Sequence, residues 1–110
     1  MQKLKQSDIR AVLREVKERL ERLYKERLVS VILYGSYARG EALKDSDIDV
    51  VVVLKGGVRP GREIDYMLDV VTDLNLKYNT LISICPVSEN AFKTVKSPLI
   101  LNVRQEGICL

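Results

Sequence analysis

Apolar residues recur every three or four positions in the first quarter of the chain. They are Ile9, Val12, Leu13, Val16, Leu20 and Leu23. This spacing predicts an amphipathic helix, and Ser7 and Asp8 precede it as an N-cap and a first-turn acid. We expect the charged opposite face to be solvated, and a basic contact surface for RNA or a protein partner is the alternative.

Two short apolar runs follow and predict strands. Residues 28–34 (LVSVILY) are rich in β-branched side chains, and Gly35 ends this run. Residues 36–41 can begin a helix that Gly40 keeps short. Residues 47–54 (DIDVVVVL) form the second strand, and their continuous apolar run predicts burial on both faces in the centre of a sheet.

The second half of the chain continues with loop, helix and strand. Glycine and proline mark residues 55–61 as a loop, and apolar spacing predicts a helix over residues 62–78. Residues 80–87 (TLISICPV) form a third strand, with Pro86 near its end. A short helix capped at Ser88-Glu89 follows.

The last segment is predicted as a helix over residues 98–106, ended by Gly107 as a C′ residue. Large apolar residues in residues 98–110 either close the core or form an interface. They are Leu99, Ile100, Leu101, Val103, Ile108 and Leu110. Cys85 and Cys109 have apolar neighbours, which favours buried free thiols over a disulfide.

This order of elements predicts a small α/β (α+β) fold, a mixed sheet flanked by helices, with residues 1–110 as one domain. No apolar run reaches the length of a membrane span and no signal peptide is evident, so we expect a cytoplasmic protein. The net charge of +3 suits an anionic substrate without requiring nucleic acid. The chain has no histidine, which excludes imidazole as a general base.

The strongest chemical signal is the segment GSYARGEALKDSDID, in which ten residues separate Gly35-Ser36 from Asp47. Gly35 permits a sharp turn, and Ser36 opens a helix whose hydroxyl and N–H groups can face an anion. Asp47 and Asp49 lie two apart on a strand, so both carboxylates point to one face. Two such carboxylates repel unless a cation lies between them, and Mg²⁺ suits the place. The segment predicts a site for a nucleoside triphosphate with magnesium.

Each part of this segment also has a purely structural explanation. Gly-Ser after a strand is often a simple turn, and paired aspartates are often solvated loop acids. Arg39 can bind a phosphate, or it can pair with Glu41 or Asp45. Tyr34 is expected in the core, whereas Tyr37 either stacks on a base, faces a partner or simply packs.

The segment resembles the nucleotidyltransferase superfamily that shares the palm-like fold of DNA polymerase beta, and more narrowly the minimal nucleotidyltransferases (MNT proteins). The resemblance implies magnesium-dependent transfer of NMP, with AMP favoured, from an NTP to an acceptor hydroxyl. It further implies that Gly35 and Ser36 hold the β- and γ-phosphates and that Asp47 and Asp49 bind the metal.

The same resemblance implies a partner. Many MNT proteins are encoded beside a HEPN-domain toxin, act as its antitoxin and can adenylylate a tyrosine on it. Two alternatives remain: an antitoxin that neutralises its HEPN partner by binding alone, and an enzyme that modifies RNA or a small molecule.

One departure from the superfamily pattern concerns a third carboxylate, which usually lies on a later strand. The matching residues 80–87 contain no Asp or Glu, and Ser83 is expected in that place. Glu89 and Asp65 are the candidate substitutes. Whether the chain turns over its nucleotide therefore stays open at this point.

Overall fold

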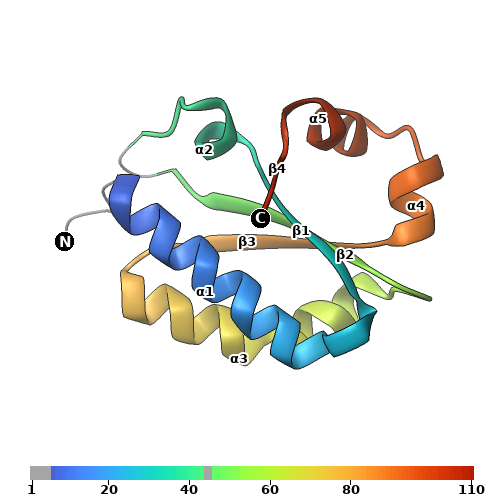
Figure 1. The fold of residues 1–110 in the computed structure, drawn as a ribbon, viewed down its shortest axis with the longest axis horizontal. Coiled ribbons are helices and arrows are strands. Elements are labelled where there is room, and N and C mark those ends of the chain that lie inside the picture. The colour runs from blue at the N-terminus through green and yellow to red at the C-terminus, as the bar shows by residue number, and fades with distance from the viewer. Residues whose placement is uncertain (1–5, 44–45) are drawn as a thin grey trace.

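A four-stranded sheet forms the centre of the molecule (Figure 1) in the computed structural model, which describes residues 6–43 and 46–110. Its strands, in spatial order, are β3 (Ile82–Ser88), β2 (Ile48–Leu54), β1 (Leu28–Tyr34) and β4 (Ile108–Cys109). β1 runs antiparallel to β2 and β4, and β2 runs parallel to β3. The predicted α/β (α+β) fold with a mixed sheet is confirmed.

Helices cover both faces of this sheet. They are α1 (Gln6–Tyr24), the 3-10 turn η1 (Lys25–Arg27), α2 (Ser36–Arg39), α3 (Pro60–Tyr78), α4 (Glu89–Thr94) and α5 (Pro98–Glu106). α1 and α3 lie on one face, and α4 and α5 lie on the other (Figure 1). α1 already includes Gln6, and the side chains of Ser7 and Asp8, predicted to start it, lie outside the described residues. Of the helices described, none has the length and apolar content needed to cross a membrane.

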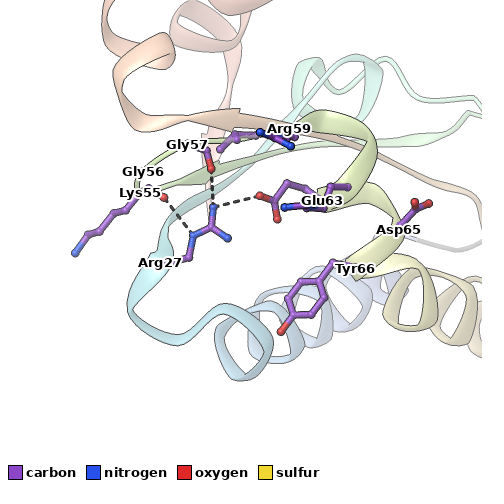
Figure 2. Close-up of a pocket in the computed structure, with 10 residues that line it drawn as sticks. Arg27, Lys55, Gly56, Gly57, Arg59, Glu63, Asp65 and Tyr66 are labelled. Carbon is purple, nitrogen blue, oxygen red and sulfur yellow. Dashed lines mark hydrogen bonds and ion pairs between the residues drawn. The ribbon is translucent and has the colours of Figure 1, made fainter.

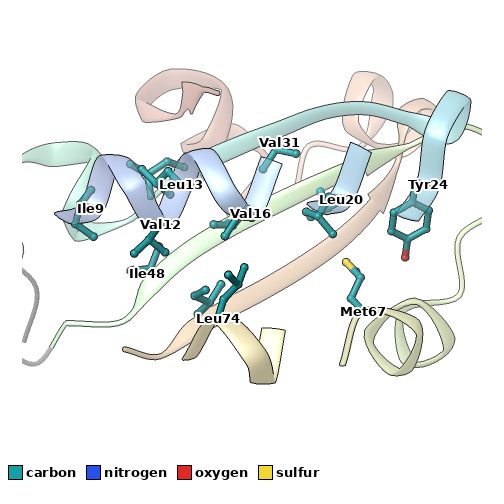
Figure 3. Close-up of a cluster of buried hydrophobic side chains, with 14 of the residues drawn as sticks. Ile9, Val12, Leu13, Val16, Leu20, Tyr24, Val31, Ile48, Met67 and Leu74 are labelled. Carbon is teal, nitrogen blue, oxygen red and sulfur yellow. The ribbon is translucent and has the colours of Figure 1, made fainter. Parts of the chain in front are cut away.

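β2 is the buried central strand that its apolar run predicts. One apolar cluster, beneath α1 and α3, takes Ile48, Val50, Val52 and Leu54. Figure 3 shows Ile48 in this cluster together with Val12 of α1 and Leu74 of α3. The second cluster, beneath α5, takes Val51 and Val53. Because alternate residues of a strand face opposite sides, Asp49 lies on the α5 side of the sheet.

The C-terminal strand β4 is an element that the apolar pattern does not predict. It has two residues, which is too short for a periodic signal, and it forms by pairing with the edge of β1. Ile100 and Val103 of α5 are buried, so this segment contributes to closing the core. Cys85 and Cys109 are both free, but Cys109 is exposed, so the prediction that it is buried was wrong.

The outer edge of β3 has no partner strand in the described part of the chain, and Pro86 lies on it. The N–H of Ile82 donates to Oδ1 of Asn75 at 2.9 Å, so it points away from β2. Pro86 has the same orientation, because backbone groups alternate along a strand. Proline has no N–H, so Pro86 removes a donor from the free edge without removing a hydrogen bond to β2.

Gly107 ends α5 as predicted, but not in the left-handed conformation that glycine often adopts after a helix. Its φ of −67° and ψ of 146° are extended and open to any residue. An added Cβ would lie 2.4 Å from the carbonyl oxygen of Val103 and 2.6 Å from Cγ2 of Ile32. The chain needs glycine here because it passes so close to α5 and β1.

We expect Gly107→Ala to lower the free energy of unfolding by about 1–3 kcal/mol, since the new methyl group overlaps its neighbours. Gly61→Ala is the matched control, because nothing lies within 4 Å of its added Cβ in α3. That change should be neutral or stabilise by up to about 1 kcal/mol. Urea unfolding measures both variants, and equal stabilities would contradict the close approach at Gly107.

Candidate active site

The turn between β1 and α2 brings Gly35 against Asp49. Gly35 has a φ of 76° and a ψ of −155°, a conformation that side-chain-bearing residues rarely adopt. A Cβ on Gly35 would lie 2.5 Å from Oδ2 of Asp49. Glycine is therefore required twice, by the backbone conformation and by the carboxylate beside it. Ser36 follows as the first residue of α2, and the first turn of a helix has N–H groups without intrahelical acceptors.

Asp47 and Asp49 lie at the start of β2. Asp47 precedes the strand and is exposed. Asp49 is half-buried and is paired across the sheet with Tyr34 of β1 and with Ser83 of β3. Ile48 lies between the two aspartates and is fully buried on the opposite face, as the alternation predicts. The buried side chain of Ile48 thus anchors the strand beneath the two aspartates, while Asp47 itself is open to solvent.

The electrostatic surroundings of Asp49 disfavour its charge. Burial raises the pKa of Asp49 above its usual range, and the nearby charge of Asp47 raises it further, while Arg39 acts in the opposite direction. The pKa of Tyr34 is also raised, first by burial and then by Asp49. Because a nearby cation favours the ionised form of a carboxylate, these residues fit a bound metal.

The two carboxylates suit a magnesium ion whose remaining ligands come from water and a substrate. In the described residues, no group of three or more His, Cys, Asp or Glu side chains is close enough to hold a metal. Mg²⁺ commonly binds one or two carboxylates, with water and phosphate oxygens as its other ligands. Asp47 and Asp49 fit that role, and they do not fit a metal held by protein ligands alone.

Arg39, at the end of α2, is held by two carboxylates. Its Nε donates to Oε2 of Glu41 at 3.0 Å, and its Nη1 donates to Oε2 of Glu106 at 3.3 Å. The pairing with Glu41 was one of the predicted alternatives, whereas Asp45 lies outside the described residues. Glu106 was not predicted, since it lies 67 positions further along the chain.

The two tyrosines beside the turn pack against the protein. Tyr34 is half-buried and packs against the cluster beneath α5, as predicted. Tyr37 is also half-buried and packs against the cluster beneath α1 and α3. These contacts favour simple packing over base stacking for Tyr37.

Ser83, which we expect in the place of the superfamily's third carboxylate, pairs directly with Asp49 in the parallel register. Glu89 lies beyond the far end of β3 and pairs with Lys93 at 3.8 Å. Asp65 lies in α3 and lines a cavity beside the loop that follows β2. Neither acid lies near Asp49, so the suggestion that either one substitutes was wrong.

That cavity, of about 880 Å³, lies at the opposite end of β2 from the aspartates. In Figure 2, Arg27 reaches the loop and donates to the carbonyl oxygens of Lys55 at 3.2 Å and Gly57 at 3.1 Å. Arg27 also pairs at 3.2 Å with the buried Glu63, which accepts a 3.0 Å bond from Tyr24. This network holds the loop to α1 and α3, and no periodic spacing of residues in the sequence indicates it.

Comparison with known proteins identifies the family. The family described as the nucleotidyltransferase domain matches residues 13–100. "Putative protein adenylyltransferase MJ0604" of Methanocaldococcus jannaschii is 38% identical over 96 residues, covering 86% of this chain and 90% of that protein. A crystal structure of a toxin-antitoxin with AMP-PNP has a similar fold, with a TM-score of 0.62 and 18% identity over 87% of this chain and 69% of that chain.

A second solved structure also shares the fold. It is the tri-AMPylated HEPN toxin of Shewanella oneidensis in complex with an MNT antitoxin, with a TM-score of 0.54 and 18% identity. The alignment covers 88% of this chain and 68% of that chain.

We expect Asp49→Asn to stabilise the metal-free protein at neutral pH. The folded-state pKa of Asp49 is raised, so wild type loses stability as pH rises from the unfolded-state pKa through the folded-state pKa. The stabilisation by Asp49→Asn should therefore be present at pH 7 and small at pH 3. Urea unfolding at both values tests this, with the exposed Asp69→Asn in α3 as control. A gain of the same size at both pH values would contradict it.

Proposed function

We propose that this chain, which belongs to the nucleotidyltransferase domain family, transfers a nucleoside monophosphate from a nucleoside triphosphate to an acceptor hydroxyl. The observation that carries the proposal is the contact between the Gly35 turn and the carboxylate of Asp49, with Asp47 beside it. A phosphate-binding turn and a metal-binding acid pair are thereby combined in one place.

In this proposal, some residues of the site bind the triphosphate and others bind the metal. Gly35 and Ser36 bind the β- and γ-phosphates through backbone N–H groups and the serine hydroxyl. Arg39 adds a guanidinium that pairs well with phosphate oxygens. Asp47 and Asp49 would hold Mg²⁺, which when bound neutralises charge on the phosphates.

The proposed transfer is an in-line displacement at the α-phosphorus. The acceptor oxygen forms a bond to the α-phosphorus while the bond to the bridging oxygen of the leaving pyrophosphate breaks. The acceptor proton leaves to solvent, since the described residues place Ser83, and no acid, beside Asp49 on β3. Gly35, Ser36 and Arg39 orient the triphosphate so that the leaving group points away from the acceptor.

We further propose ATP as the donor and a tyrosine of a HEPN-domain toxin as the acceptor, which makes the chain an antitoxin. The name of the Methanocaldococcus relative supports a protein acceptor. The solved toxin-antitoxin structures, one with AMP-PNP and one with an AMPylated HEPN toxin, support the nucleotide and the partner.

A second candidate is an antitoxin that acts by binding alone. It is favoured by one observation, the neutral Ser83 where the superfamily has a third carboxylate. A serine is a poor general base, so slow turnover or none would follow.

The deciding experiment incubates the protein with Mg²⁺, α-labelled ATP and the product of its neighbouring gene as the candidate partner. We expect label on that partner, reduced at least about 100-fold in Asp47→Asn and in Asp49→Asn because the metal ligands are lost. Asp69→Asn should label at the wild-type rate, since Asp69 is an exposed acid of α3. A stable complex with a silenced partner but no label would support the second candidate instead.

A further inference from the structure

Glu106, at the end of α5, contacts Arg39 beside the candidate active site. Its carboxylate accepts a hydrogen bond from Nη1 of Arg39 at 3.3 Å, and the two residues are 67 positions apart. Nothing in the proposed function assigns a role to it.

The elements on either side of Glu106 hold its backbone in place. Ile100 and Val103 anchor α5 in the core, and Gly107 passes against Ile32 of β1. The chain then pairs with β1 as β4. The backbone at Glu106 is therefore held in place by the core and by β1. Glu41, the other partner of Arg39, lies only two residues from Arg39 on an exposed segment.

Arg39 has donors left for a ligand in this arrangement. The guanidinium carries five N–H groups, and the bonds to Glu41 and Glu106 use one at Nε and one at Nη1. Both carboxylates raise the pKa of Arg39, so it stays charged. The backbone N–H of Arg39 donates to the carbonyl oxygen of Gly35 at 3.1 Å, which ties Arg39 to the Gly35 turn.

We propose that Glu106 is a positioning residue that holds Arg39 beside the Gly35 turn, ready to bind the triphosphate through its remaining donors. This inference rests on the proposed function, since it takes the triphosphate as the ligand of Arg39. An arginine already ordered by a fixed carboxylate loses less side-chain freedom when a phosphate binds.

The test measures the affinity for ATP in the presence of Mg²⁺ by calorimetry, in wild type, Glu106→Gln, Arg39→Ala and the double variant. We expect Glu106→Gln to raise Kd about 3- to 10-fold, in line with the cost of ordering one long side chain. The double variant should bind no more weakly than Arg39→Ala, because Glu106 acts only through Arg39. Glu89→Gln is the matched control, since Glu89 also pairs with a cation on a surface helix, and it should bind as wild type does.

A role that is merely structural would not give this pattern. Glu106 is partly exposed, so Glu106→Gln should fold, and thermal unfolding checks this. In the transfer assay, Glu106→Gln should raise KM for ATP and leave kcat unchanged.

Three results would overturn the inference while leaving the proposed function intact. They are wild-type affinity in Glu106→Gln when Arg39→Ala binds weakly, tighter binding in Glu106→Gln, and additive losses in the double variant. Tighter binding would mean that Glu106 competes with the phosphate for Arg39. Failure of wild type itself to bind ATP would instead overturn the proposed function, and the inference with it.

Discussion

The carboxylate of Asp49 lies in the space that a side chain at position 35 would fill, and the proposed chemistry depends on that close approach. Gly35 directly follows β1 and Asp49 lies at the start of β2, so the antiparallel pairing of these strands creates the contact. Ile48 and Val50 are fully buried on the other face and fix the height of the acid above the sheet. The apolar core therefore positions the carboxylate of Asp49 from the opposite face of the sheet.

The sequence predicted those parts of the site that arise from local pattern. The Gly-Ser turn, the strand alternation around Asp49 and the burial of β2 are set by residues close together in the chain, and each was found where it was expected. The contact of Arg39 with Glu106 and the true places of Glu89 and Asp65 depend on how α3, α4 and α5 pack on the sheet. No spacing in the sequence records that packing, so these features needed the structure.

Gly107 ends α5 as the sequence predicts, but the reason that glycine is needed there differs from the usual one. Glycine after a helix usually indicates a left-handed residue, yet here the backbone is extended and the hydrogen atom of glycine is what matters. The close approach to Ile32 arises because β4 must reach the edge of β1, and a two-residue strand has no pattern of its own. The residue preferences known for helix ends describe backbone angles. They do not record how closely two segments approach each other when these segments meet only in the folded chain.

Pro86 has a consequence for how another protein can approach the sheet. A strand added along β3 would need a donor at the position where proline has none, so this edge is a poor template for an intermolecular ladder. At the opposite edge, β4 offers only two residues. A partner that presents the proposed acceptor to Asp47 and Asp49 is therefore better served by side-chain contacts on a face of the molecule than by a strand added along β3.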